Sequence, residues 1–300
     1  MNGFISRIQR YSTKDGPGIR STVFLVGCNL RCKWCSNPEL LEVGLKIMYF
    51  EERCVQCGAC VALSNGTISF SGNACRIDRE RCTNLEECAD ACSYNAYEKI
   101  GIEISPERLY RKLKRDEPFY RSSGGGVTFS GGEACMQDAF VQETACLLRK
   151  DEIHTALETA GSIKWGKLEK LIECIDLILY DIKALDPGIH RRWTGVDNTL
   201  ILENARRIAA AQKPLGVRMI RVPLLNDGLP EIRARLNFIK ELGSAVQQVD
   251  ILEYHNLGRG KYVRLGMKYP LEEISAKGNR AVEHALRLAQ DLGLKTTRGG

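Results

Sequence analysis

The distribution of cysteine constrains the fold of this 300-residue chain more than any other feature. Ten of its 13 cysteines lie between Cys28 and Cys92, and the long remainder of the chain holds the other three. A secreted disulfide framework would be shorter, would have an even number of cysteines and would follow a signal peptide. In a reducing cytosol, clustered thiols are more typical of metal ligands. The cysteines therefore predict a metalloprotein.

The overall composition is close to that of an average globular chain. Hydrophobic residues make up 44% and charged residues 27%, which argues against a disordered or fibrous protein. No stretch has the roughly 18 apolar residues of a membrane helix, and residues 1–7 lack the apolar core of a signal peptide. The net charge of +6 is mild and does not demand a nucleic-acid partner. We expect a cytoplasmic protein with neither a membrane nor a nucleic-acid partner.

Strand and helix patterns alternate along most of the chain. Residues 19–26 form an apolar, β-branched run that ends at Gly27-Cys28, and residues 105–115 predict a helix with Ser105 as its cap. Repeated strand–helix units require a parallel sheet. Counting the first strand, six units fit an open doubly wound sheet or an incomplete barrel. The further predicted strands are 127–130, 155–159, 177–182, 217–222 and 249–254, and the further predicted helices are 134–149, 163–174, 198–211, 230–242 and 279–292.

Residues 54–92 differ in kind from the rest of the chain. They are rich in cysteine, glycine, serine and charged residues, with almost no aliphatic periodicity. A segment without a hydrocarbon core needs another source of stability, and bound metal can supply it. We predict a small inserted domain at 50–98 within a larger unit formed by 1–49 and 99–300, and a loose tail at 298–300.

Cys28, Cys32 and Cys35 form a C-x-x-x-C-x-x-C motif within eight residues. A loop this short can offer three thiolates to three irons of a cubane but cannot easily supply a fourth. The fourth iron would then be open to an external ligand, much as a catalytic zinc keeps an open position. On spacing alone, a zinc site completed by a distant cysteine is the alternative.

The sequence around this motif resembles that of the radical S-adenosylmethionine (SAM) enzymes that activate glycyl radical enzymes, the family of the pyruvate formate-lyase activating enzyme. The resemblance begins at residues 15–20 (DGPGIR) and continues in the family's order over nearly the whole chain. The activators nearest in pattern carry a ferredoxin-like insert and serve glycerol dehydratase, hydroxyphenylacetate decarboxylase or choline trimethylamine-lyase. The other matching segments are 123–133, 154–159, 181–183, 194–196, 221–223 and 254–258.

The resemblance implies a partial TIM-like (β/α)6 parallel barrel with an inserted bacterial-ferredoxin-like iron–sulfur domain. It implies a [4Fe-4S] cluster on Cys28, Cys32 and Cys35, with SAM at the open iron. One electron would cleave SAM to a 5′-deoxyadenosyl radical, which would take a Cα hydrogen from a glycine of the partner. The expected partners are a glycyl radical enzyme and an electron donor such as a flavodoxin or ferredoxin. A monovalent cation is expected at Glu158, Thr159 and Asp181.

The same resemblance implies that residues at the predicted strand ends bind SAM. The apolar pattern places these residues at or just beyond the carboxyl ends of the strands, where parallel barrels gather their chemistry. Lys183 could pair with the SAM carboxylate, Asp181 could accept a hydrogen bond, and His255 could contact the nucleoside. Gly131 and Gly132 would let backbone approach the ligand. The expected set is Trp34, Ser36, Gly131, Gly132, Glu133, Asp181, Lys183, Arg221 and His255.

The cysteines of the insert resemble the bacterial ferredoxin run C-x-x-C-x-x-C-x-x-x-C, whose fourth cysteine binds the other cluster. The match departs at positions 64 and 85, which are Ser64 and Leu85. Because one thiol is missing from a full set for two clusters, one or two auxiliary clusters are expected, with zinc as the alternative. The first cluster would use Cys54, Cys57, Cys60 and Cys92, and the second would use Cys75, Cys82 and Cys88.

Two other functions stay open on the sequence alone. A radical SAM enzyme that acts on a small molecule would share the barrel motifs. A non-catalytic iron–sulfur electron carrier would explain residues 54–92 but would leave the barrel without a role. The three remaining cysteines, Cys135, Cys146 and Cys174, are expected to be small core residues.

Overall fold

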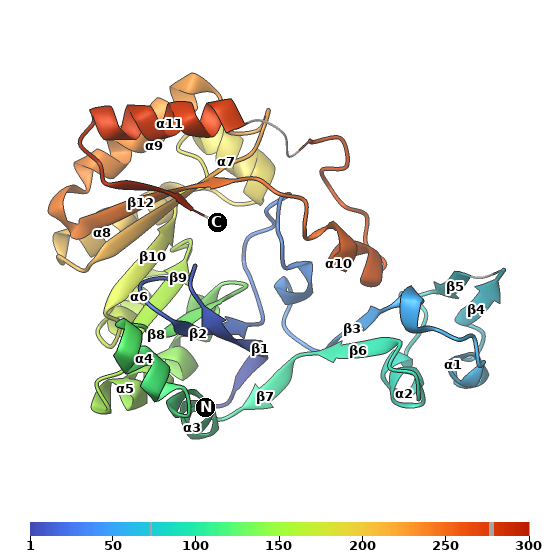
Figure 1. Cartoon of the computed structure of the whole chain (residues 1–300). Helices are drawn as coiled ribbons and strands as arrows, with labels where there is room; N and C mark the ends of the chain where they lie inside the picture. Colours follow the sequence, from blue (N-terminus) through green and yellow to red (C-terminus); the bar gives the residue numbers. More distant parts are fainter. Residues whose placement is uncertain (73, 276–278, 300) are drawn as a thin grey trace.

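The computed structural model describes residues 1–72, 74–275 and 279–299. Its body is a nine-stranded sheet in which seven neighbouring strands run parallel and curve into an open barrel (Figure 1). In order across the sheet, the strands are β13 (Thr296–Gly299), β12 (Val246–Glu253), β11 (Leu215–Arg221), β10 (Leu177–Asp181), β9 (His154–Thr159), β8 (Gly126–Gly131), β2 (Arg20–Leu25), β1 (Gly3–Ser12) and β7 (Ile102–Ile104).

Helices cover the outer face of this sheet and bury one apolar side against it. In α5 (Asp138–Lys150), the buried residues Phe140, Val141, Ala145 and Leu148 recur at helical spacing. The other helices of the body are α3 (Pro106–Lys114), α4 (Glu117–Ser123), α6 (Trp165–Ile172), α7 (Pro187–Thr194), α8 (Thr199–Ala210), α9 (Leu229–Glu241), α10 (Arg259–Arg264) and α11 (Asn279–Asp291), with 3-10 turns η1 (Pro38–Leu40), η3 (Ala134–Gln137) and η4 (Gly243–Ala245). Within the described ranges, no helix is long and apolar enough to cross a membrane.

The predicted partial barrel is confirmed. Its six expected strands are β2, β8, β9, β10, β11 and β12, each parallel to the next in the sheet. Five of these strands are mostly buried on both faces, which is why they appear in the sequence as continuous apolar runs and not as alternating ones, while β12 is only partly buried. Ser105 caps α3 as expected, since its hydroxyl accepts a hydrogen bond from the Arg108 N–H.

The prediction of a loose tail is wrong for Arg298 and Gly299. Both belong to β13, where they pair with Ile251 and Leu252 of β12, and Gly300 lies outside the described residues. β13 is a short polar strand at the edge of the sheet, and backbone pairing with β12 is enough to hold it. Its sequence therefore lacks the apolar residues from which a strand could have been predicted. Strand β1, which lies between β2 and the edge strand β7, was also missed, because most of its central residues are only half-buried or exposed.

Cys146 and Cys174, which were expected to be small core residues, are partly buried and pair with each other. The two sulfur atoms form a disulfide, with the Cα atoms 5.5 Å apart. Cys146 lies on α5 and Cys174 follows α6, and these two neighbouring helices bring the thiols together. Cys135 is buried, as expected.

The cysteine-rich insert projects from the barrel on a two-stranded neck (Figure 1). The neck is β3 (Lys46–Tyr49) paired antiparallel with β6 (Tyr97–Ile100). Beyond it lie η2 (Glu51–Arg53), α1 (Ala59–Leu63), β4 (Ile68–Ser71), β5 (Ala74–Ile77) and α2 (Leu85–Asp90). The insert has its own small buried cluster, formed by Ile47, Cys60, Ile68, Cys88, Ala96 and Tyr97.

Candidate active site

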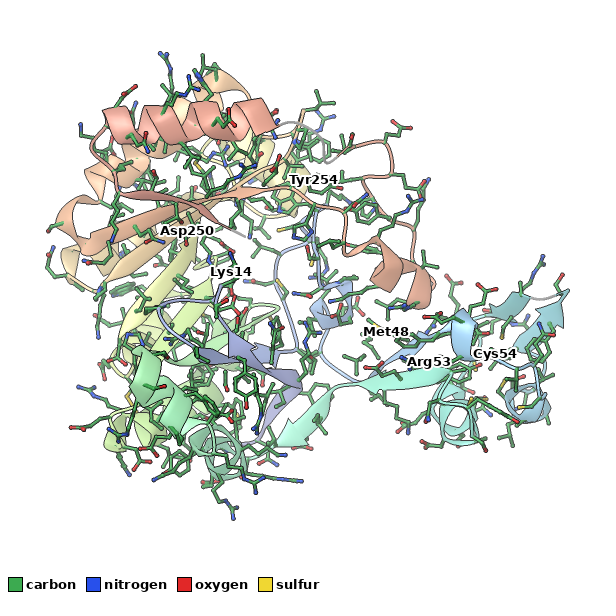
Figure 2. All side chains as sticks on the ribbon, in the orientation of Figure 1. Lys14, Met48, Arg53, Cys54, Asp250 and Tyr254 are labelled. Atoms are coloured by element: carbon green, nitrogen blue, oxygen red, sulfur yellow. A yellow bond between two sulfur atoms is a disulfide. The ribbon has the colours of Figure 1, made fainter. Side chains whose placement is uncertain are left out.

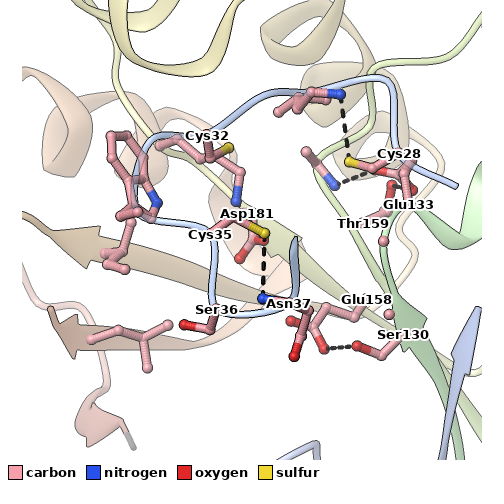
Figure 3. Close-up of a pocket in the computed structure, with 18 of the residues that line it drawn as sticks. Cys28, Cys32, Cys35, Ser36, Asn37, Ser130, Glu133, Glu158, Thr159 and Asp181 are labelled. Atoms are coloured by element: carbon pink, nitrogen blue, oxygen red, sulfur yellow. Dashed lines mark hydrogen bonds and ion pairs between the residues drawn. The ribbon is translucent and has the colours of Figure 1, made fainter. Parts of the chain in front are cut away.

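A cavity of about 320 Å³ opens at the carboxyl ends of the parallel strands. β8, β9 and β10 end at this cavity because they all run in the same direction. Figure 3 shows the loop with Cys28, Cys32 and Cys35 around the same hollow as Ser130, Glu158 and Asp181. The predicted residues that line the cavity are Cys28, Cys32, Trp34, Cys35, Ser36, Gly131, Gly132, Glu133, Asp181, Lys183 and His255.

The end of α7 anchors the cysteine loop from one side. The N–H groups of Arg31 and Lys33 donate to the carbonyls of Thr194 and Trp193 at 2.7 and 2.9 Å. These carbonyls are free to accept because the last turn of a helix leaves its C=O groups without intrahelical partners. The matched segment 194–196 therefore positions the loop between Cys28 and Cys35.

The chain that follows β12 anchors the same loop from another side. A side chain at Gly258 would place its Cβ 2.9 Å from the Ser36 Cα, so only glycine permits this approach. Just beyond, on α10, the Tyr262 hydroxyl donates to the Cys35 carbonyl at 3.2 Å. Lys261 reaches the side chains of Asn37 and Glu39, at 2.6 Å each.

The three thiols of the loop are buried and receive hydrogen bonds from the backbone, as the sulfur ligands of a cluster do. Burial raises the pKa of Cys28 to about 11 and that of Cys32 to about 12, and burial also raises the pKa of Cys35. The Leu30 and Asn37 N–H groups point at the sulfur atoms of Cys28 and Cys35, both at 3.4 Å. Bound iron would replace the thiol protons, and hydrogen bonds to sulfur stabilise cluster ligands. The loop therefore fits a cluster held at three corners.

Asp181 and Lys183 supply paired charges on the opposite wall. The Lys183 Nζ lies 3.0 Å from the Asp181 Oδ2, and both side chains are largely buried. Burial opposes the charge of Lys183, but Asp181 and the Cys32 and Cys28 sulfurs raise its pKa overall. The ammonium therefore stays charged beside the thiols, where it can meet an anionic group such as a carboxylate.

Comparison with known proteins agrees with this geometry. The family model of the radical SAM superfamily matches residues 22–239. The chain is 38% identical to the trans-4-hydroxy-L-proline dehydratase activating enzyme of Clostridioides difficile, over 100% of both chains. The chain belongs to the activating enzymes of the radical SAM superfamily. It is also 37% identical to the choline trimethylamine-lyase activating enzyme of Oleidesulfovibrio alaskensis, over 94% of this chain and 91% of that one.

One solved structure resembles this activating enzyme in sequence as well as in fold. It is a domain of the pyruvate-formate lyase-activating enzyme from Bacteroides vulgatus, with 26% identity and a TM-score of 0.51. The match covers 59% of this chain and 100% of that domain.

Glu133 lines the cavity of this activating enzyme, but its carboxylate points into the protein. Its Oε1 accepts hydrogen bonds from the Thr159 hydroxyl at 2.7 Å and the Cys135 N–H at 3.1 Å, and its Oε2 accepts from the Ala160 N–H at 2.9 Å. The side chain is 2% exposed, and burial raises its pKa against these hydrogen bonds. Glu133 thus ties the end of β8 to the end of β9, which positions both.

The glycines beside Glu133 are required by packing within the protein, and the expected approach of their backbone to SAM stays a prediction. A Cβ at Gly132 would lie 2.3 Å from the Gly27 carbonyl oxygen, and one at Gly131 would lie 2.3 Å from the Leu25 N. These atoms belong to the backbone at the end of β2, in the same polypeptide. The two glycines therefore allow the ends of β2 and β8 to pack closely, at a position that also borders the cavity.

The structure does not place Arg221 with the other expected SAM contacts. Arg221 is not among the described residues that line the cavity, and its guanidinium pairs with Asp227 at 3.0 Å. Its neighbour Ile220 does line the cavity. Side chains alternate between the two faces of a strand, so β11 turns Arg221 outward when it turns Ile220 inward.

Arg218 is a cation that faces into the barrel, and the sequence analysis did not name it. It lies two positions before Ile220 on β11, so the alternation of side chains puts both residues on the same face of the strand. Its Nη1 lies 2.7 Å from the Glu158 Oε1, while the Ser130 hydroxyl donates to the Glu158 Oε2 at 2.6 Å. Thr159, a second member of the expected cation site, donates to Glu133. In the described parts of the chain, no three His, Cys, Asp or Glu side chains converge tightly enough for a single metal ion.

A second, smaller hollow lies within the insert. Its lining includes Tyr97 and the four thiols expected to share one auxiliary cluster, which are Cys54, Cys57, Cys60 and Cys92. Cys75 lies near these thiols. Burial raises its pKa, and the Cys60 and Cys54 sulfurs raise it further.

The second group of insert cysteines expected from the sequence stays a prediction. Cys82 and Cys60 both add to burial in raising the pKa of Cys88 to about 11, and the Cys88 thiol donates to the Cys60 carbonyl at 3.6 Å. Ser64, where a ferredoxin would have a cysteine, is buried, and its hydroxyl hydrogen-bonds the backbone of Val61 and Ile68. The contacts of the described residues therefore connect Cys88 to Cys60 of the first group as well as to Cys82.

Proposed function

We propose that this protein activates a glycyl radical enzyme by using SAM bound to a [4Fe-4S] cluster on Cys28, Cys32 and Cys35. When bound, the cluster supplies one electron that cleaves SAM to methionine and a 5′-deoxyadenosyl radical, which removes a glycine Cα hydrogen from the partner. One observation carries the proposal: the three thiols and residues from the ends of separate strands line a single cavity.

The residues of the cavity have distinct roles in this proposal. Lys183 binds the SAM carboxylate, Asp181 holds Lys183 in place and accepts a polar hydrogen, and His255 contacts the nucleoside. Trp34 and Ser36 lie between and beside the thiols and border the same space. A volume of about 320 Å³ is at the lower end of the range for small-molecule sites, which suits a single bound cofactor. No general base is required, and none is assigned.

We also propose one auxiliary cluster on Cys54, Cys57, Cys60 and Cys92 that passes electrons to the SAM cluster. Met48, Arg53 and Cys54 follow one another along the arm that leads from the barrel to this site (Figure 2). A second cluster on Cys82 and Cys88 is not part of the proposal. Both assigned clusters draw electrons from a donor such as a flavodoxin or ferredoxin, in the cytoplasm.

Helix α10 supports the relay because it contacts both the cysteine loop of the barrel and the insert. Tyr262 holds the Cys35 carbonyl, as described above. Arg264 of the same helix pairs with Glu52 at 2.9 Å and lies over the Phe50 ring, 4.2 Å from its centroid. The Arg79 guanidinium of the insert donates to the Arg264 carbonyl at 2.9 Å. The insert and the cysteine loop are therefore connected through one short helix.

The monovalent-cation site expected at Glu158, Thr159 and Asp181 is not part of this proposal. Since Glu158 and Thr159 already have partners, and Arg218 supplies positive charge beside them, we expect SAM cleavage to depend little on potassium or sodium. Cleavage rates measured with each salt at equal ionic strength test this expectation.

Anaerobic reconstitution tests the proposed function. We expect a brown protein with about eight irons per chain, which forms 5′-deoxyadenosine from SAM and dithionite. With a suitable partner, it should produce the electron-spin signal of a glycyl radical. A colourless, zinc-loaded protein would refute the cluster, and absence of 5′-deoxyadenosine would favour an electron carrier. Turnover of a metabolite without any glycyl radical would favour a small-molecule enzyme.

A further inference from the structure

The cysteine loop presents positive charge on its outer side. Its side chains alternate in burial, so that Leu30 and Trp34 are buried while Arg31 and Lys33 are exposed. The two buried side chains line the SAM cavity, and the two cations are not among the described residues that do so. Both cations flank the ligand Cys32 in the chain. Positive charge therefore reaches the surface directly beside a predicted cluster ligand.

The end of α7 extends this charged surface. It lies against the loop, because its terminal carbonyls bind the Arg31 and Lys33 N–H groups and a Cβ at Gly195 would lie 3.4 Å from the Arg31 Cβ. The last turn of α7 adds two exposed arginines, Arg191 and Arg192. The loop and the helix end thus form one surface, which we call the basic face and define as Arg31, Lys33, Arg191 and Arg192.

Little negative charge offsets the basic face. Among the described residues, the one acidic side chain that pairs with it is Asp197, which lies 3.2 Å from Arg191, and both partners are exposed. The Arg31 guanidinium donates to backbone carbonyls of the loop, which carry no net charge. Lys33 and Arg192 form no ion pair within the described ranges. The basic face therefore keeps positive charge that attracts an acidic protein.

Only a thin aromatic layer separates the basic face from the thiols. The Arg192 guanidinium lies over the Trp193 ring, 5.0 Å from its centroid. Trp193 and Cys32 both pack against the buried cluster of side chains that contains Trp34. Because electron transfer falls off steeply with distance, a donor must bind where the metal site lies close to the surface. The basic face meets this requirement for a cluster on the cysteine loop.

The insert has the opposite charge. Residues 50–98 contain eight Asp and Glu but four Arg and no Lys. Lys99, just beyond this range, is already paired with Glu86 and Asp90. An acidic protein is therefore attracted more strongly to the basic face than to the insert.

We propose that the basic face docks an acidic electron-carrier protein, which reduces the SAM cluster directly. The inference rests on the proposed function, which assigns a cluster to the cysteine loop. In the docked complex, the carrier gives one electron to that cluster, so the carrier is oxidised and the cluster is reduced, and no bond forms or breaks. The relay through the insert is a separate entrance to the same cluster, so loss of either entrance slows reduction without abolishing it. The glycyl radical enzyme is the other occupant that the test distinguishes.

The test measures binding of oxidised flavodoxin, a small acidic carrier, to the reconstituted full chain without SAM, at low and at high salt. Arg192→Glu reverses one charge of the basic face. Asp197→Asn removes the acidic partner of the face and keeps an oxygen that can accept from the Thr199 N–H. Arg108→Glu is the matched control, at an exposed arginine of α3 with no ion pair in the described part of the chain. Helix α3 packs against α5, far from α7 (Figure 1).

At low salt, we expect Arg192→Glu to raise the Kd for flavodoxin about tenfold and Asp197→Asn to lower it about threefold, because exposed charges act on encounter and are screened by salt. Both differences should fade at high salt. Arg108→Glu should leave the Kd unchanged. Formation of 5′-deoxyadenosine with excess dithionite should be the same in all variants, which shows that the fold and the cavity are intact.

An unchanged Kd in both variants of the face, or an equal rise with Arg108→Glu, overturns the docking site. So does a result in which Arg192→Glu leaves the Kd for flavodoxin unchanged but raises the KM for trans-4-hydroxy-L-proline dehydratase, since the face would then bind the glycyl radical enzyme. Failure of the proposed function has a different signature. Wild-type protein that forms no 5′-deoxyadenosine with dithionite and SAM refutes that function, and direct reduction at the face with it, whatever the Kd for flavodoxin.

Discussion

The two cysteine sites of this chain both contain closely spaced thiols but differ in their surroundings. In the barrel, three thiols face a cavity of about 320 Å³ with charged and polar residues from several strand ends. In the insert, four thiols surround a much smaller hollow whose other walls are mainly apolar or aromatic, with Phe70 and Tyr97 among them. Cysteine spacing indicates iron in both places, but only the barrel leaves room for a cofactor beside the metal. Access to substrate is therefore set by the strand ends and not by the cysteines.

The largest effect should come from removing a thiol in the barrel. We expect Cys32→Ala to reduce 5′-deoxyadenosine formation to background, because two thiols cannot hold the cluster with a corner open to SAM. Cys57→Ala is the matched change in the insert, and with excess dithionite it should retain most of the SAM cleavage. Quantification of 5′-deoxyadenosine after anaerobic incubation checks both. Equal losses in the two variants would remove the distinction between the sites.

The next effect should come from the charged wall of the barrel cavity. Lys183→Met removes the ammonium expected to pair with the SAM carboxylate and leaves Asp181 without its partner. We expect the Kd for SAM to rise about tenfold to a hundredfold, the range for loss of a buried charged contact. Equilibrium binding of SAM to the reconstituted protein measures this change. Lys14→Met, at an exposed lysine near the other end of the barrel (Figure 2), should leave the Kd unchanged.

The barrel was easier to predict from the sequence than the side-chain directions within it. Buried parallel strands leave continuous apolar runs, and their common direction brings Cys28, Gly132, Asp181 and His255 to one end without knowledge of the register. Which face a residue occupies depends on register, and a shift of one position reverses it. Arg221 was misplaced for that reason.

The insert was harder to predict because its order comes from local loops and not from periodic elements. Cysteine spacing predicted one group of Cys54, Cys57, Cys60 and Cys92, and these four residues line one hollow. Nothing in the spacing could show that Cys75, on a short hairpin, lies close enough to Cys54 and Cys60 for them to raise its pKa. The contact of α10 with the insert was also hidden, since α10 is six residues long and lies far away in sequence.

A moderate effect should follow when the link between the two sites is weakened. Arg264→Ala removes the ion pair with Glu52 and the contact with the Phe50 ring. With a limiting supply of reduced flavodoxin, we expect glycyl radical formation to slow about threefold, while SAM binding is unchanged. Arg259→Ala changes an exposed arginine of the same helix and is the control. If the rate falls equally with excess dithionite, the effect is structural and the relay through this contact is wrong.

The smallest effect should come from a change at Tyr97 in the insert. The charged groups Asp181 and Lys183 of the barrel cavity pair with each other, whereas the Tyr97 hydroxyl has no such partner. Its hydroxyl is buried with no hydrogen-bond partner among the described residues, the side chain is 8% exposed, and it lines the hollow with the four thiols. Burial raises its pKa, so the hydroxyl keeps its proton and can donate it to a nearby acceptor such as a cluster sulfur.

Tyr97→Phe should therefore act in opposite directions on the empty and the loaded protein. Without iron, the variant should gain about 1 kcal/mol in the free energy of unfolding, because an unsatisfied buried hydroxyl is removed. With iron, the reduction potential of the auxiliary cluster should become more negative, since a hydrogen bond that favours the reduced state is lost. Denaturant unfolding and a redox titration measure the two changes. Tyr94→Phe removes an exposed hydroxyl beside the same hollow and should change neither. A destabilised empty protein with an unchanged potential would mean that Tyr97 serves packing alone.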